Sequence, residues 1–210
     1  MRKLLLCLSL LMGLTTLHAQ DVKNVEGRAN FPGLTFVAPE PAIMIATYDA
    51  NNNPDVMMAA WASQSDGDKI KVHLSEHKTT DNLRLKKAFT VSFATVPTLA
   101  QSDYLGTVSA KDVPDKVKRV GFTTHKAPNV NAPIVDQYSV ALECQVVSFE
   151  NGVLIGKVIN TSADKSVLDA DGNIDMGKMQ VVAFDQVTNT YRTVGGVIGK
   201  AWEIGGKFNK

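Results

Sequence analysis

The 210-residue sequence lacks a surplus of charge, a long apolar run and a set of cysteines. Lysine and arginine number 22 against 21 aspartates and glutamates, so the net charge is +1 and offers no broad basic face to nucleic acid or lipid. The most apolar stretch, Leu4–Leu14, is shorter than the roughly 20 residues that span a bilayer. We therefore expect neither nucleic-acid binding nor a stable membrane anchor.

The first residues have the pattern of an export signal. Arg2 and Lys3 precede the apolar run, and Leu17-His18-Ala19 offers a cleavage site. Cys7 lies among leucines and lacks the small neighbours of a lipoprotein cleavage site. We therefore predict a signal peptide at residues 1–19 and a secreted or periplasmic protein.

Cysteine usage constrains the rest of the chain. After cleavage Cys144 is the remaining cysteine, so no intramolecular disulfide can form despite the oxidising compartment. Cys144 lies in an apolar strand-like segment, which predicts a buried thiol and not a nucleophile. We expect an irregular segment at 20–38, where prolines discourage regular structure, and one domain at 39–210.

Strand and hairpin patterns dominate that domain. Turn residues at 49–54 and the Asn151-Gly152 pair each predict a hairpin. Short helices are expected at 80–88, 99–104 and 114–120. The expected strands are Ala42–Tyr48, Asp55–Trp61, Lys69–Leu74, Thr90–Thr95, Ser139–Phe149, Val153–Ser162, Val181–Phe184 and Tyr191–Val194. Together these elements predict a mainly β fold, an antiparallel barrel with short flanking helices.

Two Ser/Thr-rich elements have the composition of an anion site. Leu74–Leu83 runs from a strand end into a helix, and Asp103–Asp112 is a polar segment before a short basic helix. A helix N-terminus exposes unpaired N–H donors and partial positive charge, so hydroxyls and a lysine beside it suit a phosphate. Taken alone, Thr79 and Thr80 are more typical of ordinary helix capping, and Lys116 of a solvated helix charge.

No pattern predicts a metal site or a catalytic side chain. His73, His77 and His125 have no cysteine or carboxylate partners at ligand spacing. Asp169–Asn173 departs from a calcium loop, because its glycine is fourth and Gln180 stands where a bidentate glutamate belongs. No Ser/His/Asp constellation is visible. We therefore expect no bound metal and no protein acid, base or nucleophile.

The motifs of the domain follow one another in a recognisable order from about Pro39 to Trp202. They are Pro41-Ala42, Thr47-Tyr48, Asn53–Met57, Ala60-Trp61, Lys78–Asn82, Lys87–Ser92, Asp103–Ser109, Asp115-Lys116, Ala132–Val135, Leu142–Cys144, Val167–Ala170 and Gly199–Trp202. In this order they resemble the flavin reductase-like family, and within it the flavoredoxin group. The resemblance implies an FMN-binding split β-barrel of antiparallel, Greek-key type that works as a homodimer.

The resemblance also implies which residues contact the flavin. Trp61 matches an aromatic residue beside the isoalloxazine ring, Ala62 and Ser63 would line the ring, and Phe184 would close over it. Thr79 and Asn82 match the segment at the ribityl-phosphate end, and Ser109 and Lys116 match a loop and a lysine that approach the cofactor. Asp55 would place an anion near the flavin. The implied cofactor-binding set is Asp55, Trp61, Ala62, Ser63, Ser75, Thr79, Asn82, Ser109, Lys116 and Phe184.

The phosphate end of FMN is thereby predicted to lie at Thr79 and Asn82 on the helix start, assisted by Ser109 and Lys116. A phosphate dianion needs several donors and at least one cation, which these two elements concentrate. The chain also departs from the family pattern. Asp55 stands where an asparagine is common, Ser75-Glu76 where a basic residue is common, and Asn151 where some relatives have a histidine.

The family implies electron or hydride transfer through bound FMN, as in an FMN-dependent oxidoreductase, with NAD(P)H or a protein as the electron donor. A non-catalytic flavin carrier or binding protein is the alternative, and the predicted export favours it because NAD(P)H is a cytoplasmic reductant. A split-barrel oxidase resembling the pyridoxamine-phosphate oxidases is a third hypothesis, although its motif order differs.

Overall fold

The computed structural model describes Lys23 and residues 25–208. The chain forms two units, Met1–Thr35 and Phe36–Lys210. In the first, the described residues form turns without helix or strand. The predicted signal peptide at 1–19 lies outside the described residues. None of the described helices is long and apolar enough to cross a membrane.

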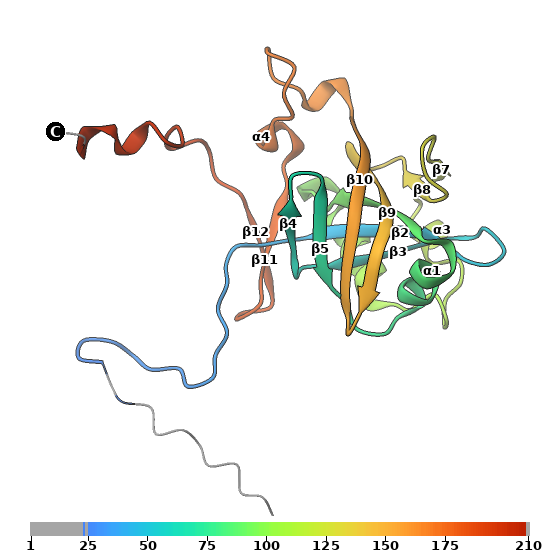
Figure 1. The fold of residues 1–210 in the computed structure, drawn as a ribbon, viewed down its shortest axis with the longest axis horizontal. Coiled ribbons are helices and arrows are strands. Elements are labelled where there is room, and N and C mark those ends of the chain that lie inside the picture. Colours follow the sequence, from blue (N-terminus) through green and yellow to red (C-terminus); the bar gives the residue numbers. More distant parts are fainter. Residues whose placement is uncertain (1–22, 24, 209–210) are drawn as a thin grey trace, which may run out of the picture. The chain divides into compact units, whose positions relative to one another are not determined.

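A curled antiparallel sheet of seven strands forms the body of the second unit (Figure 1). Its strands are β2 (Ile43–Tyr48), β3 (Pro54–Ala59), β4 (Ala62–Asp66), β5 (Lys69–His73), β6 (Ala88–Phe93), β9 (Val140–Glu150) and β10 (Val153–Ala163). They pair in the order β3-β2-β6-β9-β10-β5-β4. The two edge strands are therefore neighbours in sequence, joined through Ala60 and Trp61. The predicted split antiparallel barrel is confirmed.

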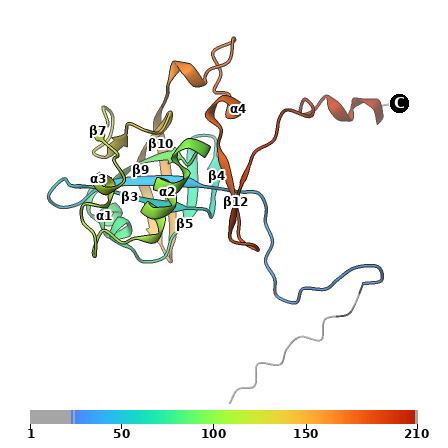
Figure 2. The ribbon, with the colours of Figure 1, turned by 180° about the vertical axis from the view of Figure 1, so that it is seen from behind.

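Two smaller sheets accompany the barrel. One contains β1 (Glu40–Pro41), β11 (Val182–Asp185) and β12 (Thr190–Thr193); the other pairs β7 (Thr124–Lys126) with β8 (Pro133–Val135). Both views of the ribbon place the β11–β12 hairpin beside β4 (Figures 1 and 2). The small β1-β11-β12 sheet thus flanks the edge at which the barrel closes.

Short helices fill the connections. They are α1 (Lys78–Lys86), α2 (Leu99–Thr107), α3 (Lys116–Arg119) and α4 (Met176–Met179), with 3-10 turns at η1 (Val96–Thr98), η2 (Lys165–Val167) and η3 (Ile204–Phe208). The first three correspond to the helices predicted at 80–88, 99–104 and 114–120. At the start of α1 the Thr80 hydroxyl accepts a hydrogen bond from the His77 N–H at 2.9 Å, which satisfies one donor of the first turn.

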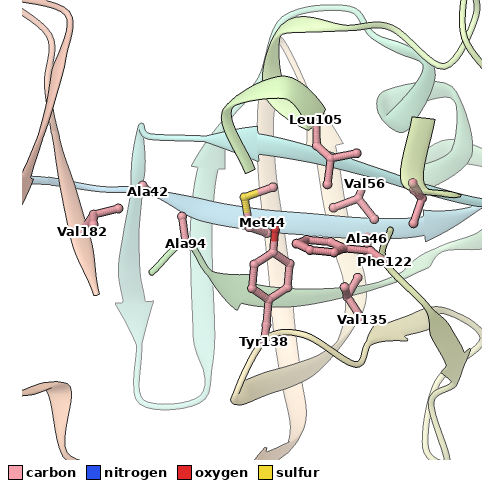
Figure 3. Packing of buried hydrophobic residues seen from close by; sticks show 11 residues of the cluster. Ala42, Met44, Ala46, Val56, Ala94, Leu105, Phe122, Val135, Tyr138 and Val182 are labelled. Carbon is pink, nitrogen blue, oxygen red and sulfur yellow. The ribbon is translucent and has the colours of Figure 1, made fainter. Parts of the chain in front are cut away.

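The core is built on β2, which is buried on both faces. Side chains alternate along a strand, so Ile43 and Ile45 face one apolar cluster while Met44 and Ala46 face another. Figure 3 shows Met44 beneath Leu105 of α2 and beside the ring of Tyr138. This double burial explains the nearly continuous apolar run of β2, which a strand with one solvated face would not have.

Both predicted hairpins are confirmed. Between β2 and β3, the Asp49 carboxylate accepts the backbone N–H groups of Asn51 and Asn53, each at 2.8 Å. Between β9 and β10, Asn151 and Gly152 adopt positive φ angles of 51° and 77°. Such angles match the right-handed twist of the flanking strands, which is why Asn-Gly is favoured there.

Strand β4 was not predicted from the sequence. Its residues, Ala-Ser-Gln-Ser-Asp, have no alternation of apolar side chains, and most of them are exposed. Because β4 is an edge strand, pairing with β5 holds it in place and burial does not. The predicted strand Asp55–Trp61 therefore ends at Ala59, and the chain turns into β4.

A buried carboxylate fixes the loop between β7 and β8. Glu143 of β9 is fully buried and accepts three hydrogen bonds, from the Asn129 N–H at 2.7 Å, the Asn129 amide at 2.8 Å and the Asn160 amide at 2.8 Å. Burial alone would raise the pKa of Glu143, but the bonds from Asn160 and Asn129 outweigh it, so this pKa lies below its ordinary value of 4.5. The ionised form therefore stabilises the fold.

We expect Glu143→Gln to lower the free energy of unfolding at neutral pH by about 1.5–3 kcal/mol, because charge-assisted hydrogen bonds are lost. The lowered pKa means that the wild-type contribution is present above pH 4.5 and is lost as the pH falls through the folded-state pKa. Urea unfolding between pH 7 and 3 should therefore show a steeper acid loss for wild type than for Glu143→Gln. Glu150→Gln, at the exposed end of β9, is the control. Parallel profiles for wild type and Glu143→Gln would contradict this account.

Candidate functional site

The two-residue link between β3 and β4 makes a sharp corner in the backbone. The Ala62 N–H donates to the Ala60 carbonyl at 2.8 Å, and the His73 N–H donates to the Trp61 carbonyl at 2.9 Å. The backbone of Trp61 is thus held against β5, while its side chain remains 58% exposed. A large aromatic ring in solvent at a fixed position is available to pack against a ligand.

A cavity of about 390 Å³ opens at this corner. Its walls come from the end of β3, the link Ala60-Trp61, the segment after β5 with Ser75 and His77, and Phe184 of β11. We refer to it as the corner cavity. Its volume lies within the range of about 300–1,000 Å³ that is usual for small-molecule sites. Three predicted site residues, Trp61, Ser75 and Phe184, therefore meet at one cavity.

A second hollow of about 340 Å³ adjoins the first and shares five lining residues with it, Met58, Ala59, Ala60, Phe184 and Asn189. Its far side is formed by α2 and by Tyr191 of β12. Gly106 of α2 faces this hollow, and a Cβ atom there would lie 2.8 Å from the Met58 Cβ atom. Glycine therefore permits α2 to approach β3 closely enough to form this wall.

The β11–β12 hairpin is tied to the barrel at the same place. The Tyr191 hydroxyl donates to Asp103 Oδ1 at 2.7 Å, and the Tyr191 ring lies 5.7 Å from that of Phe184. Burial, followed by the bond to Asp103, raises the pKa of Tyr191, so the hydroxyl stays a donor at neutral pH. This bond holds the hairpin that carries Phe184. In the sequence, Tyr191 has no signal beyond strand alternation.

Three predicted residues form a buried network around one ion pair. Lys116 Nζ is 3.2 Å from Asp55 Oδ1, and the Thr79 hydroxyl donates to Asp55 Oδ2 at 2.6 Å. Lys116 Nζ also donates to the Leu105 and Val108 carbonyls at 3.0 and 2.9 Å. Lys116, Asp55 and Thr79 are each at most 2% exposed. The network joins β3, α1, the end of α2 and α3 into one block.

The other predicted residues of the phosphate end also have protein partners. The Asn82 side chain, 1% exposed, donates to the Thr47 hydroxyl at 3.0 Å. Ser109 is half-buried, and its hydroxyl accepts the Lys111 N–H at 3.1 Å. Lys111 forms an ion pair with Asp81 of α1 at 3.0 Å. The structure thus brings the two Ser/Thr-rich elements together, as the sequence suggested. Their side chains, however, bond to other groups of the protein.

The exposed polar groups lie on the segment between β5 and α1. Ser75, Glu76 and His77 are exposed. Glu76 forms an ion pair with Arg84, whose guanidinium lies 2.5 Å from Glu76 Oε1. Ser75 and His77 line the corner cavity at the start of α1, where the first-turn N–H groups point out of the helix. Ala62 and Ser63 follow Trp61 on β4, and Ser63 is exposed.

The buried thiol predicted at Cys144 is confirmed. Cys144 is free and fully buried, and burial, with the neighbouring Glu143 carboxylate, raises its pKa to about 12. A thiol held protonated in this way is a poor nucleophile. Among the described residues, no three histidine, cysteine or acidic side chains converge in a way that could hold a metal ion.

We expect Lys116→Met to lower the free energy of unfolding by about 3–5 kcal/mol, because Asp55 would remain buried without its counter-ion. The double variant Asp55→Asn/Lys116→Met removes both charges and should regain a large part of that loss. Lys118→Met, on the exposed side of α3, is the matched control and should change the free energy by less than about 0.5 kcal/mol. A Lys116→Met protein as stable as the control would show that the pair is dispensable.

Comparisons with known proteins place this geometry in a family. The flavin reductase like domain matches residues 37–180. The comparison with curated proteins gave no match. Flavoredoxin of Desulfovibrio vulgaris (Miyazaki F) superposes with a TM-score of 0.79 at 29% identity, over 88% of this chain and 100% of that one.

Two further structures share the fold. Flavoredoxin from Methanosarcina acetivorans has a TM-score of 0.78 at 22% identity, over 86% of this chain and 98% of its own. An FMN-binding domain of a flavin reductases-like enzyme from Shewanella baltica OS155 has a TM-score of 0.67 at 20% identity, over 77% and 89%. Family and fold together support a flavin-binding redox function. The chain belongs to the flavin reductase like domain family.

Proposed function

We propose that the chain binds FMN in the corner cavity and transfers electrons or hydride through it. The observation that carries this proposal is the convergence of exposed Trp61, Phe184 and the start of α1 on one cavity. The domain family and the Shewanella FMN-binding domain support the choice of flavin. Once bound, FMN would supply the redox chemistry, and the protein would set its position and potential.

The donor set of the cavity fits such a cofactor. An isoalloxazine ring needs apolar and aromatic surface, which Trp61, Phe184 and Met58 supply. A phosphate needs donors, which the Ser75 hydroxyl, the His77 imidazole and the first-turn N–H groups of α1 can provide. We therefore propose that the ring lies against Trp61 and Phe184, with Ala62 and Ser63 beside it, and that the phosphate lies towards Ser75 and His77.

The buried predicted residues then take a supporting role. Asp55, Thr79 and Lys116 bond to one another and to backbone carbonyls, so their side chains have few free donors for a ligand. Their network fixes α1 against β3, and Asn82 adds a second tie through Thr47. We propose that these residues, with Ser109 in the adjoining loop, orient the helix start that meets the phosphate.

We also propose that the protein is exported and forms a homodimer, as the leader pattern and the family resemblance suggest. Export favours a protein donor or a carrier role over NAD(P)H oxidation. Sizing by light scattering tests the homodimer, and a monomer at micromolar concentration would contradict it. Periplasmic recovery of the expressed chain, shortened at its N-terminus, tests export.

Titration with FMN and riboflavin tests the proposed site. Trp61→Ala should weaken both flavins about tenfold, because ring contact is lost. Ser75→Ala/His77→Ala should weaken FMN about tenfold to a hundredfold and leave riboflavin unchanged, because charge-assisted hydrogen bonds are worth about 1.5–3 kcal/mol each.

Lys116→Met serves as the internal comparison in this titration. If the lysine only supports the fold, the Lys116→Met substitution should weaken the binding of FMN and of riboflavin equally. A selective loss of FMN would instead make Lys116 a direct phosphate ligand. A purified protein that neither retains nor rebinds FMN would refute the proposed function.

Rapid mixing with reductants distinguishes the two hypotheses, a flavin reductase and an electron carrier. We expect NADH and NADPH to bleach the bound flavin slowly, and dithionite to bleach it rapidly, if the protein works as an exported electron carrier. Rapid bleaching by either nucleotide, with multiple turnovers when excess FMN is added, would establish a flavin reductase. Dithionite reduction is the control for flavin accessibility.

A further inference from the structure

The last described residues, 195–208, form an arm whose apolar side chains lie in solvent. Val197 and Ile198 are each 96% exposed and Trp202 is fully exposed. Within this C-terminal arm, the hydrogen bonds and the ion pair join its own residues, as between Lys200 and Glu203. Burying each such side chain is worth about 1.5–3 kcal/mol. An apolar cluster of this kind is typical of a surface that another molecule covers.

An apolar groove lies where the C-terminal arm begins. It has a volume of about 420 Å³ and lies between β6, β9, β11 and α4, with Phe93, Leu142, Met176 and Val181 among its lining residues. Val194, directly after β12, also lines it. The groove is distinct from the corner cavity, with which it shares no lining residue.

One residue in the wall of the groove has a buried polar atom without a partner. Glu40 is 8% exposed, and its Oε2 atom has no hydrogen-bond partner in the described part of the chain. Burial raises the pKa of Glu40 above its ordinary value, although the nearby Trp61 side chain acts to lower it. A buried oxygen without a donor costs about 1–3 kcal/mol. This oxygen is buried in the wall, so what the groove offers an occupant is apolar surface.

We propose that the C-terminal arm of each subunit lies in the apolar groove of a second copy. This inference rests on the proposed homodimer and names its contact. In a single chain, Val197 and Ile198 stay exposed although the groove begins at Val194, which favours the groove of another subunit over the arm's own.

The surface available is sufficient for such an exchange. Symmetric exchange makes each contact twice. The Trp202 and Phe208 side chains of two arms would bury about 600–1,000 Å² at about 150–250 Å² per ring. The aliphatic side chains of Val197, Ile198 and Ile204 add to this, which brings the total near the roughly 1,200–2,000 Å² of a stable interface.

Light scattering and sedimentation of full-length and altered proteins test the exchange. Deletion of residues 195–210 and Met176→Glu in the groove should each weaken dimerisation at least tenfold. Val147→Glu is the matched control, since Val147 and Met176 are both 56% exposed and Val147 lies outside the groove. In a Trp61→Phe protein, Trp202 is the remaining tryptophan, and its emission should shift to the red when the dimer is diluted.

Several outcomes would overturn the exchange. A dimer unaffected by the deletion would mean pairing through another surface. A monomer with shielded Trp202 emission would mean docking of the arm in its own groove. A dimer unaffected by Met176→Glu, with an apolar small molecule displaced by that variant, would make the groove a ligand site. Titration of each protein with FMN tests the flavin function separately. If none of the proteins binds FMN, the flavin function is refuted, whereas the proposed exchange of arms is not affected.

Discussion

The closure of the barrel is the constraint on which the rest of the structure depends. The seven-stranded sheet begins with β3 and ends with β4, yet these strands are separated by only Ala60 and Trp61. The sheet must therefore curl until its two edges meet. This closure places the end of β3, the end of β5 and the start of α1 around one corner, and the β11–β12 hairpin beside it. The corner cavity is a consequence of this topology.

The polar residues near the corner divide into a buried frame and an exposed rim. Asp55 and Lys116 form an ion pair in the interior, where an unpaired charge would be strongly unfavourable, and Thr79 donates to the same carboxylate. Ser75 and His77, on the neighbouring segment, keep their side chains in solvent. A frame of this kind can preorganise a ligand site without touching the ligand, because it removes freedom from the helix that carries the donors.

Much of the fold was predictable because local signals and tertiary packing agreed. The Asn151-Gly152 turn, the Asp49 turn and the three helices all appeared at the expected places, since turn chemistry and helix capping act over a few residues. Strand β4 was missed because it is polar and exposed, and its pairing partner supplies what the sequence does not show. Among the site residues, Trp61, Ser75 and Phe184 meet at the cavity, whereas Tyr191 gave no local signal beyond strand alternation, and nothing local showed that Asp103 would bond to it.

The sequence alone determined the class of fold, the family and the chemical types gathered near the site: hydroxyls, a lysine and two aromatic rings. The tertiary structure decided which of these groups face inward. Thr79 and Lys116 lie in segments that look like a phosphate site, but the direction of a side chain depends on the element packed against it. Asp55, far away in sequence, attracts both of them because a buried carboxylate must find donors and a counter-ion. No pattern within either segment could have shown that pairing.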